Sequence, residues 1–231
     1  MVENLQISRA TKQNWIRLGS DCQSKLARRA NKTRSSKRIV ATNYLKNNDA
    51  MRLLDMVKSV NAPIEDIIYS LSVSYLRWAK IIDKDHVKQF LSRYSQFNLL
   101  DLTVPAYAWS LDNDVLGFIY QSLIAEGERI STGQYYTSKE VVSYILDGKV
   151  LKDGETFLDP CCGSGAFLLG VKTDNPTCLY GFDINPIAVL IASTNLLVKY
   201  SDYTFAPNVY CLDFLKKDLP PCGTNRPDGV P

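Results

Sequence analysis

The feature that most constrains the fold is a glycine-rich segment that joins a short apolar run to the expected start of a helix. Residues 159–167 read Asp-Pro-Cys-Cys-Gly-Ser-Gly-Ala-Phe and follow directly on the apolar run 156–159. Glycine lets a backbone turn sharply and approach a ligand without a Cβ atom in the way. We therefore expect a strand, a tight turn and a helix in succession, with a ligand beside Gly163 and Gly165.

The alternation of strands and helices continues to residue 214. The apolar runs 177–183 and 208–214 indicate two more strands, and residues 186–200 indicate a helix between them. This βαβαβ order predicts a parallel, doubly wound sheet in an α/β domain. Upstream of it, Thr137-Ser138-Lys139-Glu140 has the spacing of a capping box, which predicts that a helix begins there.

An acidic residue ends each of the three expected strands: Asp159, Asp183 and Asp213. A carboxylate after the second strand can accept both hydroxyl groups of a ribose. Asp213 could accept from the amine of an adenine, and its neighbour Phe214 could cover the ring. Because parallel strands end at one edge of the sheet, we expect these groups to bind one molecule containing an amino acid, a ribose and an adenine. The alternative is that they serve only as caps and turns.

The chain before this α/β part divides into two further parts. Residues 49–130 show apolar positions at helical spacing and predict an all-α domain. Residues 1–48 form a basic segment, in which the stretch 7–19 is either the second helix of a helix-turn-helix module or a plain amphipathic helix. With residues 131–231 as the α/β part, we expect three domains.

Positive charge is concentrated in the N-terminal segment. The chain has a formal net charge of +3, yet eight basic residues and no acidic one lie between Asp21 and Asp49. Localised positive charge suits a polyanion such as duplex DNA. The alternative is a solvated linker. The candidate DNA-binding residues are Arg28, Arg29, Lys32, Arg34, Lys37 and Arg38.

Cysteine and hydropathy patterns limit the other classes of function. The six cysteines have no CxxC spacing, which favours reduced thiols in a cytoplasm. The single histidine, His86, lies far from any cysteine, so we expect no metal site. No apolar run approaches the ~20 residues that span a bilayer, and the N-terminus has no secretion signal, so we expect no membrane association.

Several segments together resemble the N6-adenine DNA methyltransferases, the group that includes type I modification subunits and related type II restriction–modification enzymes. The resemblance runs from Asp114 to Phe214. It rests on the lead-in DVLGFIYQSLI, on Thr-Gly-Gln-Tyr-Tyr-Thr at 132–137, on DPCCGSGAFLL, and on GFDINP with the helix through Asn195. It implies a methyltransferase fold, S-adenosylmethionine as cofactor and adenine in duplex DNA as substrate.

The resemblance also implies a set of cofactor-binding residues. Tyr135, Tyr136 and Thr137 would close over the methionine end of the cofactor, and Asp159 would bind its ammonium group. Asp183 would hold the ribose, and Asp213 with Phe214 the adenine. Cys161 and Cys162 stand where the family has small residues, so we interpret them as packing residues rather than nucleophiles. The full set is Gln134, Tyr135, Tyr136, Thr137, Asp159, Cys161, Gly163, Ser164, Gly165, Asp183, Ile184, Asp213 and Phe214.

One element of the family does not occur in this sequence. In the family, an Asn/Asp-Pro-Pro-Tyr/Phe segment after a fourth strand orients the amine of a flipped adenine. The chain contains no such tetrapeptide, so we expect no catalytic residue in it and no turnover by the chain alone. A fourth strand would pair beside the first, and without it strand 156–159 is expected to be a sheet edge.

Three accounts of the missing segment stay open. The chain is a truncated gene product, or one half of an enzyme completed by a second polypeptide or a second copy, or a non-catalytic binder. The first function hypothesis is accordingly an adenine-N6 DNA methyltransferase of a restriction–modification system, with the cofactor site but no catalytic motif. The alternatives are a non-catalytic DNA-binding or assembly module with the same fold, and a methyltransferase of RNA or protein.

Overall fold

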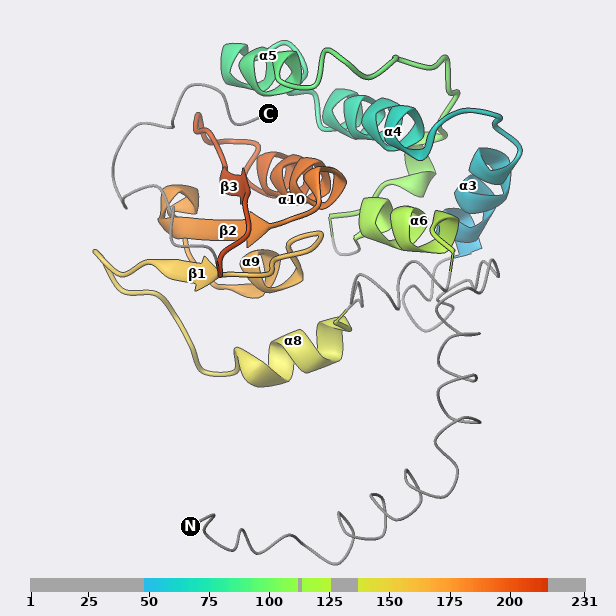
Figure 1. Ribbon diagram of the computed structural model, residues 1–231. Coiled ribbons are helices and arrows are strands. Elements are labelled where there is room, and N and C mark those ends of the chain that lie inside the picture. Colours follow the sequence, from blue (N-terminus) through green and yellow to red (C-terminus); the bar gives the residue numbers. More distant parts are fainter. Residues whose placement is uncertain (1–47, 112–113, 126–136, 216–231) are drawn as a thin grey trace, which may run out of the picture. The chain divides into compact units, whose positions relative to one another are not determined.

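The computed structural model describes residues 48–111, 114–125 and 137–215 (Figure 1). The basic segment up to residue 47, with the 7–19 helix and all six candidate DNA-binding residues, lies outside the described residues, as do Gln134, Tyr135 and Tyr136. The described helices and strands are α3 (Asn48–Lys58), α4 (Ile64–Trp78), α5 (Asp85–Ser92), η1 (Ala106–Ala108), α6 (Val115–Leu123), α8 (Lys139–Ile145), β1 (Phe157–Asp159), α9 (Ala166–Gly170), η2 (Pro176–Cys178), β2 (Leu179–Asp183), α10 (Pro186–Lys199) and β3 (Asn208–Cys211).

The strands form a parallel sheet in the order β1-β2-β3, with β2 in the middle (Figure 1). Asp159 pairs in register with Gly181, and Asp183 pairs with Cys211, so the carboxyl ends of all three strands lie together. Helix α9 connects β1 to β2, and α10 connects β2 to β3. The predicted combination of helices with a small parallel sheet is therefore confirmed.

Helix α10 begins at a strong start signal. The side chain of Asn185 accepts hydrogen bonds from the backbone N–H of Ile187 at 2.9 Å and of Ala188 at 3.4 Å. Pro186 occupies the first helical position, where its missing N–H costs nothing. The helix is buried around its whole circumference, because residues 187–198 are all buried, and most of them are apolar. A helix of this kind needs partners on every side.

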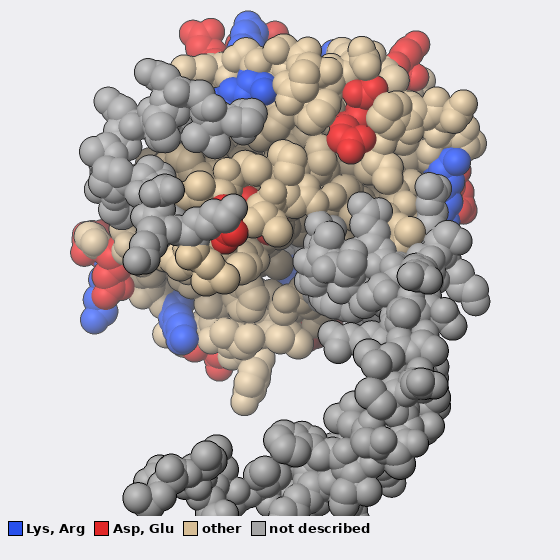
Figure 2. Space-filling model, in the orientation of Figure 1, with Lys and Arg blue, Asp and Glu red and all other residues tan. Residues whose placement is uncertain are grey.

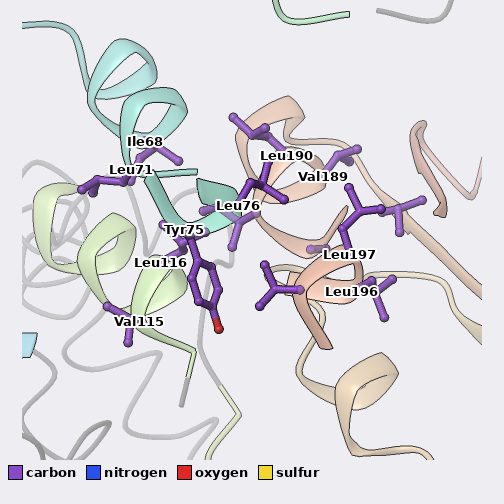
Figure 3. Packing of buried hydrophobic residues seen from close by; sticks show 14 of the residues in the cluster. Ile68, Leu71, Tyr75, Leu76, Val115, Leu116, Val189, Leu190, Leu196 and Leu197 are labelled. Atoms are coloured by element: carbon purple, nitrogen blue, oxygen red, sulfur yellow. The ribbon is translucent and has the colours of Figure 1, made fainter. Parts of the chain in front are cut away.

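Those partners are the sheet on one side and the upstream helices on the other. Helix α10 packs against β2 and β3, and also extensively against α4 and more lightly against α6. Figure 3 shows the contact, with Leu76 of α4 beside Leu190 of α10. Residues 48–123 and 137–215 accordingly share one hydrophobic core and belong to one compact unit.

A buried carboxylate fixes the segment that follows α5. Asp66 of α4 accepts hydrogen bonds from the backbone N–H and the side-chain amide of Asn98, both at 2.9 Å. Ser70, one turn further along, accepts from the N–H of Leu100 at 2.8 Å. These bonds satisfy polar groups that would otherwise be buried without partners.

None of the described helices has the length and apolar character needed to cross a membrane.

Three predicted boundaries are wrong by a few residues. Helix α8 is capped by Ser138, whose hydroxyl accepts from the N–H of Val141, and not by Thr137. Strand β2 begins at Leu179, because residues 176–178 form a 3-10 turn capped by Asn175. Strand β3 ends at Cys211, so Asp213 and Phe214 follow the strand and do not end it. The Asp213 carboxylate accepts from the N–H of Leu215 at 3.1 Å.

Candidate functional site

The turn after β1 has the conformation that its glycines predict. Gly163 has φ +52° and Gly165 has φ +91°, a region that other residues rarely adopt. The N–H of Gly165 donates to the carbonyl of Cys162, and the N–H of Cys162 donates to the carbonyl of Phe182 in β2, each at 2.8 Å. A Cβ atom on Gly163 would meet no atom of the described residues within 4 Å. The backbone at Gly163 is therefore open to a ligand.

Asp183, at the end of β2, joins this turn to the next one. Its Oδ2 accepts from the N–H of Gly163 at 2.9 Å, and its Oδ1 accepts from the N–H of Asn185 at 2.8 Å. A carboxylate offers about four lone-pair directions. The two backbone bonds fix its orientation and leave room for further donors, such as the two hydroxyls of a ribose.

Asp159, at the end of β1, lies in a negatively charged environment. Its Oδ1 accepts from the N–H of Cys161 at 3.2 Å. Burial raises the pKa of Asp159, the Cys161 hydrogen bond lowers it, and the charge of Asp183 raises it further. No described Lys or Arg forms a salt bridge with Asp159 or Asp183. Two coupled carboxylates without a described counter-ion favour a cationic ligand.

The surface around the strand ends carries few charges. Figure 2 shows an acidic group exposed where the strands end, on a face whose other visible residues are mostly uncharged. Ile184, directly after Asp183, exposes 65% of its surface. An exposed apolar side chain beside two carboxylates gives this region both a charged part and an apolar part, as ligands with an ionic end and a flat ring require.

The end of β3 contributes an aromatic group. The N–H of Leu212 donates to the carbonyl of Asp183 at 2.9 Å, which holds the segment after β3 beside β2. The ring centroid of Phe214 lies 5.4 Å from that of Phe182, which in turn lies 5.5 Å from that of Tyr210. The structure therefore places Phe214 next to β2, within a cluster of three rings.

The two adjacent cysteines differ in environment. Cys162 is buried, and its Sγ would lie 3.0 Å from a Cβ atom on Gly181, so it packs between the turn and β2. Burial, with the charges of Asp183 and Asp159, raises the pKa of the Cys162 thiol. Cys161 is exposed. The interpretation as a packing residue agrees with the burial of Cys162, and for Cys161, which also belongs to the predicted cofactor-binding set, it stays a prediction.

The sequence analysis did not predict two hydrogen-bonded contacts between the helices and the turns. Asn195 of α10 donates from its amide to Asp114 Oδ1 at 2.9 Å and to the carbonyl of Ser164 at 3.1 Å. Asn185 donates from its amide to the hydroxyl of Tyr120 in α6 at 2.6 Å. Asp114 also caps α6, because it accepts from the N–H of Gly117 at 2.8 Å.

Of the predicted site residues, those at the strand ends come together. A hydrogen bond links Asp183 to the turn 163–165, and the charge of Asp183 acts on Asp159. Ile184 and Phe214 flank this group. Thr137 lies two residues before α8, next to the capping residue Ser138. Helix α8 packs against α9. At this contact, Val142 of α8 and its C-cap residue Leu146 occupy the space beside Gly170 of α9.

Comparison with known families identifies this arrangement. Residues 111–225, about half of the chain, match the family described as N-6 DNA Methylase. The chain belongs to this family. The match includes α6, the turn after β1 and the ends of β2 and β3, which are the parts that build the site.

Individual N-6 DNA methylase relatives agree with this assignment. The type II methyltransferase M.VspI of Vibrio sp. (strain 343) is 37% identical over 84 residues, which cover 35% of this chain and 21% of that protein. The HindI type I methylase subunit of Haemophilus influenzae is 32% identical over 105 residues, 40% of this chain and 23% of that protein. The MjaVII type I methylase subunit of Methanocaldococcus jannaschii is 26% identical over 153 residues, 63% of this chain and 25% of that protein.

The chain thus spans about a fifth to a quarter of the length of these relatives. No solved structure matches it.

Proposed function

We propose that the ends of β1, β2 and β3 bind S-adenosylmethionine, and that the chain serves adenine-N6 methylation of DNA in a restriction–modification system. The observation that carries the proposal is the bond between Asp183 and Gly163. It joins an acidic residue at the end of β2 to the open glycine turn that follows the neighbouring strand β1. Nucleoside-containing ligands bind at this place in parallel sheets.

The charges of the residues fit this cofactor. S-adenosylmethionine carries two cationic groups, an ammonium and a sulfonium, and the described site offers Asp159 and Asp183 without a described salt-bridge partner. Asp159 would bind the ammonium group, and Asp183 would accept from the ribose hydroxyls. Asp213, Ile184 and Phe214 would border the adenine. When bound, the cofactor supplies an activated methyl group.

The chain's own residues then have defined tasks. The turn 163–165 lets the backbone approach the cofactor, Ser164 and Cys161 line it, and Gln134, Tyr135, Tyr136 and Thr137 would cover the methionine end. The sequence contains no Asn/Asp-Pro-Pro-Tyr/Phe segment. We therefore propose that methyl transfer requires a segment that these 231 residues do not include, with duplex DNA as the substrate and the basic residues 28–38 as one of its contacts.

Calorimetry tests the cofactor proposal directly. The folded 231-residue chain is titrated with S-adenosylmethionine and, separately, with S-adenosylhomocysteine, which lacks the sulfonium charge. Binding of the first is expected, and Asp159→Ala and Asp183→Ala should each weaken it. The control is Asp202→Ala, because Asp202 is an exposed carboxylate after α10. No heat with the folded, unsubstituted chain would refute the proposed cofactor.

A second measurement addresses the reaction. Transfer of a labelled methyl group to duplex DNA is followed with the chain alone, and DNA, RNA and protein acceptors are compared. We expect no transfer by the chain alone. Methylation of DNA without any added polypeptide would contradict the proposed division of tasks, and transfer to RNA or protein would contradict the proposed substrate.

A further inference from the structure

The start of α6 meets the cofactor turn and α10 at one buried point. Asp114 Oδ1 accepts from the N–H of Gly117 at 2.8 Å and from the amide of Asn195 at 2.9 Å. The same Asn195 amide donates to the carbonyl of Ser164 at 3.1 Å. Asp114 and Asn195 are both buried. One amide therefore ties the turn after β1 to a carboxylate 50 residues upstream of Ser164.

Gly117 makes this close approach possible. A Cβ atom at position 117 would collide with Asp114 Oδ2 and would lie 2.8 Å from Ser164 Oγ. Glycine is a poor helix former, and α6 is otherwise composed of residues that pack well. Its presence here follows from the space that the Asp114 carboxyl group and the Ser164 hydroxyl occupy.

The Asp114 carboxyl group is held at a cost to the fold. Its Oδ2 is buried and has no hydrogen-bond partner of good geometry among the described residues. Burial raises the pKa of Asp114, and interactions with Ser164, Gly117 and Asn195 oppose that rise. A buried oxygen of this kind in a native structure requires an explanation beyond simple helix capping, which an exposed Asp provides equally well.

A second residue of α6 reaches the other turn. Tyr120 accepts from the Asn185 amide at 2.6 Å. The Asn185 side-chain oxygen caps α10, and its backbone N–H donates to Asp183 Oδ1. Tyr120 thus fixes the side chain of a residue that also fixes the Asp183 carboxylate.

We propose that α6 positions the cofactor site, with Asp114 acting on the turn after β1 and Tyr120 acting on the turn after β2. Both are positioning residues, because they act through Asn195, Ser164 and Asn185 and not on the cofactor itself. The inference rests on the proposed function, since the two turns are those that would hold S-adenosylmethionine. If α6 positions both turns, cofactor affinity depends on a helix that lies outside the sheet.

Amide hydrogen exchange of the cofactor-free chain tests whether α6 holds the two turns in place. In Tyr120→Phe and Asp114→Ala, the N–H groups of Gly163, Gly165 and Asn185 should exchange about three- to tenfold faster, as expected for the loss of one hydrogen bond that restrains them. Asp114→Asn retains an acceptor oxygen and should restore slow exchange. The matched controls are Tyr200→Phe, which removes a hydroxyl bonded to Thr173, and Asp66→Ala, which removes the buried carboxylate of α4.

Calorimetric titration with S-adenosylmethionine tests whether α6 also affects cofactor affinity. Tyr120→Phe is expected to raise Kd about three- to tenfold, with Tyr200→Phe within about twofold of the unsubstituted chain. If Asp114→Ala does not fold, Tyr120→Phe decides, because it removes one oxygen and leaves the cap of α10 intact.

The outcomes separate the two proposals. Binding by the unsubstituted chain, with exchange rates and Kd of Tyr120→Phe equal to those of Tyr200→Phe, overturns the role of α6 and leaves the proposed cofactor standing. Absence of binding by the folded, unsubstituted chain overturns both. Faster exchange confined to α4 and α6 in Asp114→Ala, with unchanged turns, also overturns the positioning role.

Discussion

Asp183 accepts a hydrogen bond at 2.9 Å from the backbone N–H of Gly163, so the end of β2 directly holds the turn that follows β1. The two residues are 20 positions apart and meet because β1 and β2 pair in parallel. The bond orients the carboxylate before any ligand is present. A site arranged in this way loses less conformational freedom when it binds, which favours affinity.

Removal of the Asp183 carboxylate should affect both the turn and the ligand. Asp183→Ala leaves the N–H groups of Gly163 and Asn185 without their acceptor, and bonds to a charged group contribute about 1.5–3 kcal/mol each. We expect a lower melting temperature and at least a tenfold, roughly 1.4 kcal/mol, loss of affinity for S-adenosylmethionine. Calorimetry and thermal unfolding measure the two effects. An Asp183→Ala affinity equal to that of the exposed control Asp202→Ala would contradict this.

Acid should weaken cofactor binding through Asp159. Burial and the charge of Asp183 raise the pKa of Asp159 in the folded chain, despite the hydrogen bond from Cys161. As the pH falls through this raised pKa, the carboxylate takes up a proton and no longer attracts an ammonium group. The loss of affinity should therefore begin above the pH near 3.9 at which an ordinary Asp titrates. Asp159→Asn should bind more weakly and lack this pH-dependent component.

The same shift has the opposite effect on stability. Because the folded chain binds the Asp159 proton more tightly than the unfolded chain, the free energy of unfolding falls as the pH rises from the unfolded to the folded pKa. Above that window the ionised carboxylate destabilises the fold in full. Asp159→Asn should therefore be more stable than the unsubstituted chain at neutral pH, as measured by urea unfolding. Lower stability of Asp159→Asn at neutral pH would refute the raised pKa.

The positions of the acidic residues could be predicted from the sequence because they depend on local pattern. The apolar runs locate the strands, and parallel pairing then brings Asp159 and Asp183 to one edge. The boundaries were less predictable, since Thr137 and Ser138 are both good caps, and only the backbone conformation selects Ser138. Likewise, Asp213 lies beyond β3 because strand pairing with β2 ends at Cys211.

The contacts of α6 could not be predicted in this way. The bond between Asn195 and Asp114 joins residues 81 positions apart, and that between Asn185 and Tyr120 joins residues 65 apart. Such pairs depend on how α4, α6 and α10 pack, which no local spacing encodes. Gly117 was the available signal, because a glycine inside an apolar helical run indicates close approach by another group.

Thiol labelling should distinguish the two adjacent cysteines. Cys161 is exposed, whereas Cys162 is buried and has a raised pKa, so its reactive thiolate form is scarce. Iodoacetamide should modify Cys161 in the folded chain and Cys162 only after unfolding, as read by fragmentation mass spectrometry of the peptide that contains both. S-adenosylmethionine should protect Cys161 if the proposed site is correct. Equal labelling of both thiols in the folded chain would contradict the buried environment of Cys162.

A cavity in α4 should destabilise the cofactor turn as well as the helices. Leu76 is fully buried against α10, and a Leu→Ala change in such a position costs about 2–5 kcal/mol. Helix α10 is capped by Asn185, which bonds to Asp183, so a loss of packing on α4 reaches the site through one continuous core (Figure 3). Urea unfolding of Leu76→Ala, followed by circular dichroism and by amide exchange at Gly163, should give one shared transition at lower urea. Leu111→Ala, at a position 64% exposed, is the control and should stay within about 0.5 kcal/mol. Two separate transitions, with exchange at Gly163 unchanged in Leu76→Ala, would show that the helices and the site unfold independently.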